Sequence, residues 1–147
     1  MIIAIPMNGR ERVFHQNPCS CTLFALYEVT GDRSNVQYRF LENRLNPWQK
    51  HDGEMVNNTE MIECSCDIQK SKDPQHISQH YIILEVIGKV DYVIVDQYCL
   101  NTLYTFKNVG IKIHKIPPFI KTAKEALNHF IIGADIADKI QHIHAVS

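Results

Sequence analysis

Residues 91–95 read Asp-Tyr-Val-Ile-Val, and this short run decides the fold class of the 147-residue chain. A continuous apolar strand of this kind is typical of a parallel strand that is covered on both faces. Before it, Asp73-Pro74 is a helix start signal and Gly88 is a stop signal, so a helix is predicted over about 74–87. A strand that lies between helices indicates an α/β protein.

The alternation continues after this strand. Three more elements are predicted: a helix over 100–107, a strand over 111–116 and a helix from about 122 to 132. Gly133 is expected to separate the last helix from a short helical tail over 133–147.

The first part of the chain reads as three strands in a meander, over Ile2–Pro6, Thr22–Val29 and Val36–Leu41. A polar segment follows, in which Asn46-Pro47 is one of several turn signals. With a right-handed crossover into the strand at 92–95, the simplest arrangement is a five-stranded mixed sheet, ordered 3-2-1-4-5 and flanked by helices. The domain is therefore expected to cover 1–132, with a cysteine-bearing insertion at about 45–72.

Composition limits the class of partner. The chain carries 15 basic and 16 acidic residues, a formal charge of -1, so no nucleic-acid or anionic-membrane partner is expected. The apolar run Ile2–Pro6 is too short for a signal peptide, and no segment has the roughly 18 apolar residues of a membrane helix. We therefore expect a cytoplasmic protein, whose cysteines remain reduced.

Five cysteines in such a chain call for an explanation other than disulfides, and two Cys-Ser-Cys motifs account for four of them: Cys19/Cys21 and Cys64/Cys66, with Cys99 as the fifth. Open α/β sheets bind ligands beyond the carboxyl ends of strands where the strand order reverses, here between the first and fourth strands. The segments that carry all five cysteines end at this edge, so we expect the five to converge.

The spacing favours a polynuclear site. In an extended Cys-x-Cys segment both sulfurs point to one side, with Cα atoms about 6.6 Å apart, which suits a sulfide cluster better than one ion. Thiolates favour soft metals, so iron leads, with molybdenum, copper and zinc as alternatives. Histidines are secondary candidates: His76, His80 and His15 could add ligands, His142 and His144 are weaker, and His51, His114 and His129 have no predicted partner.

No enzyme motif is present. The sequence contains no paired strand-end carboxylates, no glycine-rich phosphate loop and no Gly-x-Ser-x-Gly elbow, so no catalytic residue is predicted. Two other readings stay open: a cytoplasmic thiol redox enzyme and a zinc-stabilised interaction module.

Several short segments of the chain, namely IIAIP, FALYEV, DYVIV, LNTL and GIKIHKI, resemble the dinitrogenase iron-molybdenum cofactor biosynthesis family over roughly residues 1–132. The resemblance implies a ribonuclease H-like motif fold without nuclease activity. It also implies a protein that carries, stores or helps to assemble an iron-sulfur or heterometallic cluster for a client metalloprotein. A homo-oligomer that shares a cluster across its interface remains open.

The chain departs from the family pattern at its presumed cluster region. Asn17 and Cys19 stand where the family commonly has histidine and glycine, and Cys99 stands at a usual glycine position. These departures favour a cysteine-rich variant. The sequence therefore predicts a protein that binds a metal cluster without catalysis, through Cys19, Cys21, Cys64, Cys66 and Cys99.

Overall fold

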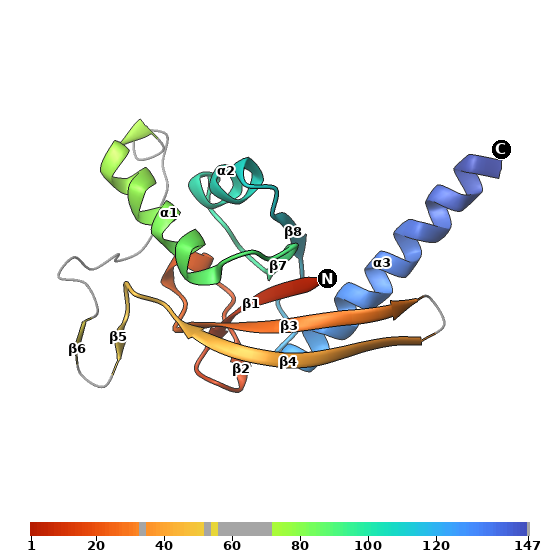
Figure 1. Ribbon diagram of the computed structural model, residues 1–147, viewed down its shortest axis with the longest axis horizontal. Coiled ribbons are helices and arrows are strands. Elements are labelled where there is room, and N and C mark those ends of the chain that lie inside the picture. The colour runs from red at the N-terminus through yellow and green to blue at the C-terminus, as the bar shows by residue number, and fades with distance from the viewer. Residues whose placement is uncertain (33–34, 52–53, 56–71, 147) are drawn as a thin grey trace.

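A mixed sheet forms the centre of the molecule (Figure 1). The computed structural model of the chain describes residues 1–32, 35–51, 54–55 and 72–146. Within this part, six strands form one sheet in the order β4-β3-β1-β7-β8, with β2 paired to β1. The strands are β1 (Ile2–Asn8), β2 (Arg12–Val13), β3 (Leu23–Asp32), β4 (Asn35–Leu45), β7 (Tyr92–Val95) and β8 (Lys112–Lys115). The predicted α/β class and the predicted order of its five strands are both confirmed.

The direction of pairing follows the connections. β1 pairs antiparallel with β3, and β3 with β4, so these three strands form a meander. β1 pairs parallel with β7, and β7 with β8, because helices cross between them. A short hairpin, β5 (Lys50–His51) with β6 (Glu54–Met55), lies outside this sheet.

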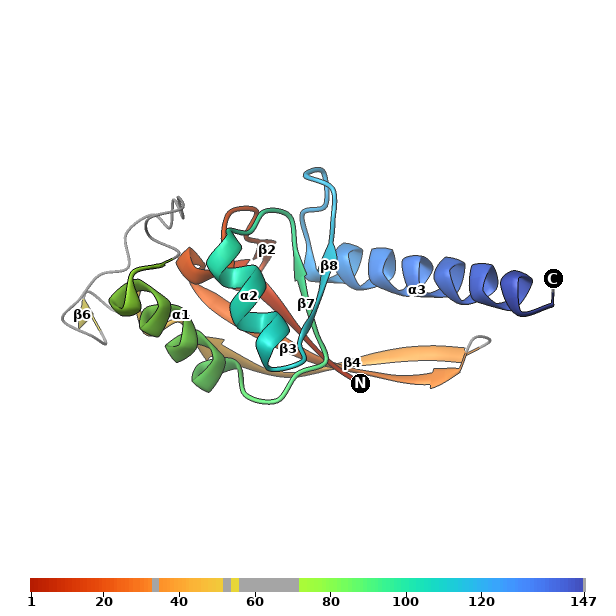
Figure 2. The same cartoon turned by 90° about the horizontal axis from the view of Figure 1, so that it is seen from above.

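The helices are α1 (Pro74–Ile87), α2 (Leu100–Asn108) and α3 (Ala123–Val146), with a 3₁₀ turn, η1, at Pro18–Ser20. α1 and α2 lie side by side on one face of the sheet (Figure 2). Successive β1 side chains point to opposite faces. Thus Ile3 and Ile5 pack in one core cluster with Leu127 of α3, whereas Ala4 packs in the other with Ile83 of α1.

Both ends of α1 match the prediction, because the signals are local. The Asp73 carboxylate accepts a hydrogen bond from Gln75 N at 3.1 Å, and Pro74 occupies the first turn. Gly88 ends the helix at φ 73° and ψ −153°, a conformation that residues with a Cβ rarely adopt.

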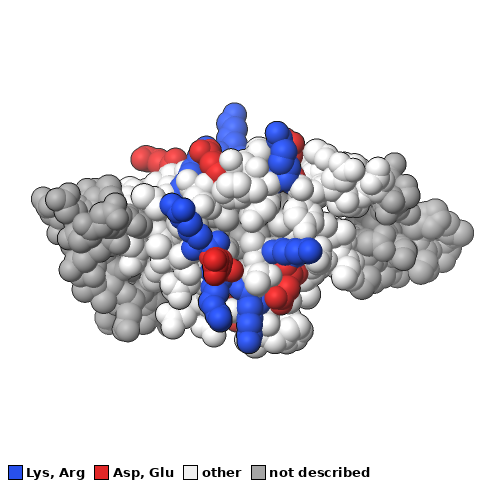
Figure 3. Space-filling model, turned by 90° about the horizontal axis from the view of Figure 1, so that it is seen from below, with Lys and Arg blue, Asp and Glu red and all other residues white. Residues whose placement is uncertain are grey.

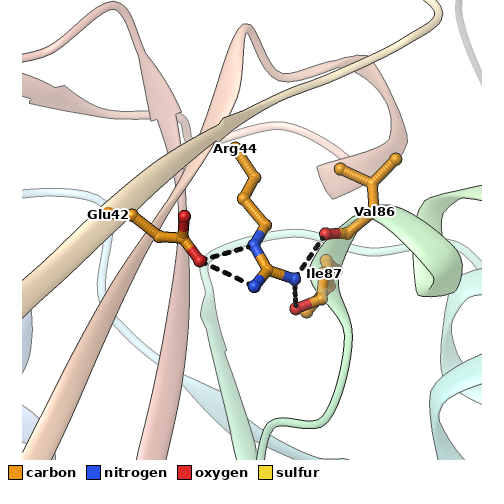
Figure 4. Close-up of polar contacts among 4 residues, drawn as sticks. All are labelled: Glu42, Arg44, Val86 and Ile87. Carbon is orange, nitrogen blue, oxygen red and sulfur yellow. Dashed lines mark hydrogen bonds and ion pairs between the residues drawn. The ribbon is translucent and has the colours of Figure 1, made fainter.

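A side chain of β4 completes the C-terminus of α1 (Figure 4). Arg44 Nη1 donates hydrogen bonds to the carbonyls of Val86 and Ile87, both at 3.0 Å. Its Nε and Nη2 donate to Glu42 Oε1 at 3.0 and 2.6 Å. A guanidinium at the last carbonyls of a helix satisfies unpaired acceptors and complements the helix dipole. This contact fastens α1 to β4.

Gly133 does not break the last helix, which corrects the prediction. α3 continues as one helix from Ala123 to Val146. A Cβ at position 133 would lie 3.2 Å from His114 Cε1, so glycine allows the helix to approach β8 closely. Packing of this kind overrides the cost of glycine in a helix, about 1 kcal/mol. His114, for which the sequence offers no candidate partner, hydrogen-bonds to His129 of α3.

Charged side chains of both signs are intermingled on the face shown in Figure 3. Among the residues that the structure describes, no helix combines the length and apolar character needed to cross a membrane.

Candidate functional site

Two loops meet beyond the carboxyl ends of β1 and β7. Asp96 directly follows β7 and is buried, and its Oδ2 lies 3.0 Å from His15 Nδ1 in the segment that connects β2 with β3. This pair joins loops that are 81 residues apart in sequence. His15, a candidate ligand, therefore has a carboxylate as its partner.

Asn17 makes a second connection across the same edge. Its Oδ1 accepts hydrogen bonds from Cys99 N at 3.2 Å and from Thr102 Oγ1 at 2.8 Å. Its Nδ2 is buried and is the only such side-chain nitrogen or oxygen in the described residues that has no hydrogen-bond partner. An amide donor in this state normally costs about 1–3 kcal/mol.

Cys99 occupies the N-cap of α2. Its Sγ accepts a hydrogen bond from Thr102 N at 3.4 Å, in place of the oxygen that usually fills this role. The same sulfur lies 3.5 Å from His80 Nε2, which projects from α1 and is buried. An N–H donor and an imidazole thus both adjoin one half-buried sulfur.

Thr102 brings a second sulfur to this place. Its Oγ1 lies 3.3 Å from Cys99 Sγ and 3.4 Å from Cys19 Sγ. Because the hydroxyl proton is directed to Asn17, the lone pairs of Oγ1 are left to accept from the thiols. Cys19 and Cys99, 80 positions apart in the sequence, therefore converge on one hydroxyl. This agrees with the predicted convergence for two of the five cysteines.

Cys21 lies differently from Cys19. The prediction of an extended Cys-x-Cys segment is wrong at Cys19, which lies inside η1. The Cys21 thiol donates to Leu23 O at 3.3 Å and is fully buried in an apolar cluster. Burial, and secondarily the nearby Cys19, raise the pKa of Cys21 well above its ordinary value. In its present position Cys21 is a neutral thiol.

Asn46 holds the backbone of this Cys-Ser-Cys motif. Its Nδ2 donates to Cys19 O and to Cys21 O, both at 2.8 Å, and its Oδ1 accepts from Trp48 N at 3.0 Å. The side chain is completely buried. The sequence marked Asn46 only as a turn signal, because nothing local shows that its amide reaches residues 25 to 27 positions earlier.

Other predicted ligands fall outside these contacts. Cys64 and Cys66 lie outside the described residues, as do the side chains of His76, His142 and His144. The described residues contain no group of three or more His, Cys, Asp or Glu side chains arranged to hold a metal ion. What the structure brings together is Cys19, Cys99 and His80, around Thr102 and Asn17.

No family model matches the sequence, and no curated protein matches it significantly. A similar solved structure is the NMR structure of a Thermotoga protein described as a candidate NifB protein of the DUF35 family. The two chains are 18% identical, the match covers 90% of this chain and 88% of that one, and the TM-score is 0.48.

Proposed function

We propose that this protein binds a metal-sulfide cluster or a soft metal ion as cargo, at the edge beyond β1 and β7, and that it carries or stores this cargo without catalysing a reaction. One observation carries the proposal: the sulfurs of Cys19 and Cys99 contact the same Thr102 hydroxyl, and His80 Nε2 lies beside Cys99 Sγ. Thiolate and imidazole are the donors that soft and borderline metals prefer.

The local field supports a thiolate at Cys99. The sulfur stands at the N-terminus of α2, where the helix dipole stabilises negative charge, and it already accepts a backbone N–H from Thr102. A metal replaces the thiol proton, so a position that stabilises thiolate also favours metal binding.

Asn17 supports an anionic cargo. Its Oδ1 fixes the amide beside Cys99 and Thr102, while its buried Nδ2 has no partner among the described residues. A thiolate or an inorganic sulfide would supply the acceptor that this N–H group lacks. Hydrogen bonds to sulfur are one means by which proteins tune iron-sulfur clusters.

The remaining ligands stay predictions from sequence. Cys64 and Cys66 are proposed to complete the site with Cys19 and Cys99, and iron is the leading metal, with molybdenum, copper and zinc as alternatives. Cys21 is proposed as a ligand only if it leaves its bond to Leu23 O. A client metalloprotein would receive the cargo.

Anaerobic reconstitution with iron and sulfide tests the proposal. The wild-type protein should gain visible absorption and bind iron with inorganic sulfide, and Cys99→Ser should lose most of both. Asn43→Ala, an exposed change on β4 away from the cysteines, is the control and should retain the metal. A wild-type protein that stays colourless and free of metal after reconstitution would contradict the proposal.

A thiol redox enzyme is the second candidate, favoured by the contact between Cys99 and His80 and by the proximity of Cys19. It predicts reversible two-electron oxidation of the protein without bound metal, with loss of two titratable thiols. Thiol counting before and after a mild oxidant, on metal-free protein, separates this candidate from the carrier.

A further inference from the structure

Two imidazoles meet between the sheet and α3. His114 Nε2 of β8 lies 3.0 Å from His129 Nδ1 of α3, with the rings 5.2 Å apart and inclined at 59°. Both side chains are half-buried. A hydrogen bond between two ring nitrogens needs one N–H and one lone pair, so at least one of these imidazoles must be neutral while the bond exists.

The surroundings of the pair are largely apolar. The rings of His114 and Phe130 form a T-shaped pair with centroids 5.2 Å apart, and the centroids of Phe130 and Tyr92 of β7 lie 4.8 Å apart. The helix backbone also approaches closely, because a Cβ at Gly133 would lie only 3.2 Å from His114 Cε1.

Few ionisable groups face the pair in the described part of the chain. From β8, the Lys112 ammonium lies 5.7 Å over the Tyr92 ring of β7. On α3, Glu125 lies one turn before His129, and its carboxylate accepts from Lys121 N and Thr122 Oγ1. No salt bridge within the described residues joins a carboxylate to His114 or His129, so no direct ion pair there offsets a second positive charge.

We infer that His114 and His129 form an acid-released latch that fastens α3 to β8. The pair tolerates one added proton, since an imidazolium can donate to a neutral imidazole. A second proton removes the only lone pair in the bond and places two cations in contact. The latch is therefore closed near neutral pH and opens in acid.

The surroundings of His114 also oppose its protonation, as the latch requires. Burial, and secondarily the charge of His129, lower the pKa of His114 below its ordinary value. Acid must therefore overcome both effects before the second proton binds.

Opening should be local. Ala126 and Leu127 before His129, and Phe130 after it, stay buried in the core cluster against the sheet. The second half of α3 extends past the sheet, in the same direction as the hairpin of β3 and β4 (Figures 1 and 2). Release of His129 thus removes the contact of α3 with β8 that follows the last buried turn, so it loosens the part of α3 beyond Phe130 and leaves the core in place.

Hydrogen exchange of the full chain tests the latch. From pH 7.5 to pH 5, exchange of the α3 amides after about residue 130, corrected for intrinsic rates, should rise about tenfold or more. A tenfold rise is expected if the closed latch disfavours the second protonation by about one pKa unit. His129→Gln should abolish this acid-dependent increase, because glutamine does not titrate. Lys124→Gln, an exposed change on α3 itself, should leave the increase intact.

Two results would overturn the inference: an acid-independent corrected rate in the wild-type protein, or an increase that persists in His129→Gln. Should that variant not fold, NMR titration of the wild-type imidazoles gives a second readout. Loss of α3 protection should then follow the second of two coupled protonations of His114 and His129, and loss that follows the first, or neither, would reject the latch.

Discussion

Cys99 Sγ lies 3.5 Å from His80 Nε2, so the residue that begins α2 touches the middle of α1. The same sulfur caps α2 by accepting the N–H of Thr102. One atom therefore serves the fold as a cap and, in our proposal, the cargo as a ligand.

Serine and alanine at position 99 should separate these two roles. Cys99→Ser supplies an oxygen that can cap α2, so the free energy of unfolding of the metal-free protein should change little while metal binding falls. Cys99→Ala also loses the cap and should cost about 1 kcal/mol. Urea unfolding of the metal-free proteins checks this. Equal losses of stability in the two variants would show that the sulfur is not an effective cap.

Replacement of Asn46 should be strongly destabilising. Asn46→Ala leaves the carbonyls of Cys19 and Cys21 and the N–H of Trp48 without their partner, and should lower the free energy of unfolding by about 3 kcal/mol. Asn46→Asp keeps the shape but turns an acceptor toward two carbonyls, so it should be worse. The exposed Asn43→Ala is the control and should change stability by less than about 0.5 kcal/mol. A loss for Asn46→Ala no larger than for this control would refute the bridging role.

Removal of the Arg44 side chain should free the end of α1. Arg44→Ala should cost about 1–2 kcal/mol, since two helix carbonyls and Glu42 lose their donor. Arg39, on the same strand as Arg44, pairs with Glu28 of β3 but is 70% exposed, so Arg39→Ala should cost less than about 0.5 kcal/mol. Chemical denaturation of both variants makes the comparison, and equal effects would mean that the contact with α1 adds nothing.

Gly88 and Arg44 should be energetically coupled. A Cβ at Gly88 would lie 2.7 Å from Arg44 Nη1, in addition to the strain of the positive φ. Gly88→Ala should therefore cost about 1–3 kcal/mol in the wild-type protein, and less in an Arg44→Ala background. A double-mutant cycle measures the difference. Strictly additive losses would indicate that strain alone explains the requirement for glycine.

Cys21 should make the protein sensitive to alkali. Because burial raises its pKa in the folded state, the unfolded chain ionises first as the pH rises. The contribution of the neutral thiol to the free energy of unfolding is complete below the ordinary thiol pKa of about 8.5, and it is lost as the pH rises toward the raised pKa of the folded state. Cys21→Ala should lower the free energy of unfolding by about 1 kcal/mol at pH 7. Between pH 8 and 10, however, the free energy of unfolding of this variant should fall less steeply than that of the wild-type protein. Urea midpoints at several pH values test this, and parallel declines would exclude the thiol as the cause.

Local signals explain what the sequence predicted well. The ends of α1 were predictable because Asp73, Pro74 and Gly88 act within one turn of the helix. Connection rules then gave the strand order, and the order placed Cys19 and Cys99 at one edge. Each of these predictions uses only signals from neighbouring residues or rules on how consecutive strands connect.

The remaining features depend on contacts between distant segments. Asn46 reaches across to the Cys-Ser-Cys backbone, Arg44 reaches the end of α1, and His114 meets His129. No periodicity or spacing encodes such pairs. Gly133 reads as a helix stop for the same reason, because its benefit is the space it leaves for His114 on another element.

The anchoring of residues 46–48 has an evolutionary consequence. Asn46 fastens the chain to the motif around Cys19, and Trp48 Nε1 donates to Gln79 O of α1 at 3.2 Å. The chain that leaves β4 is thus fixed beside the helix to which it must return. When both ends of a connection are held in this way, doubling its length costs only about 0.6 kcal/mol in closure entropy. Insertions and deletions between these two anchors therefore need not reorganise the sheet.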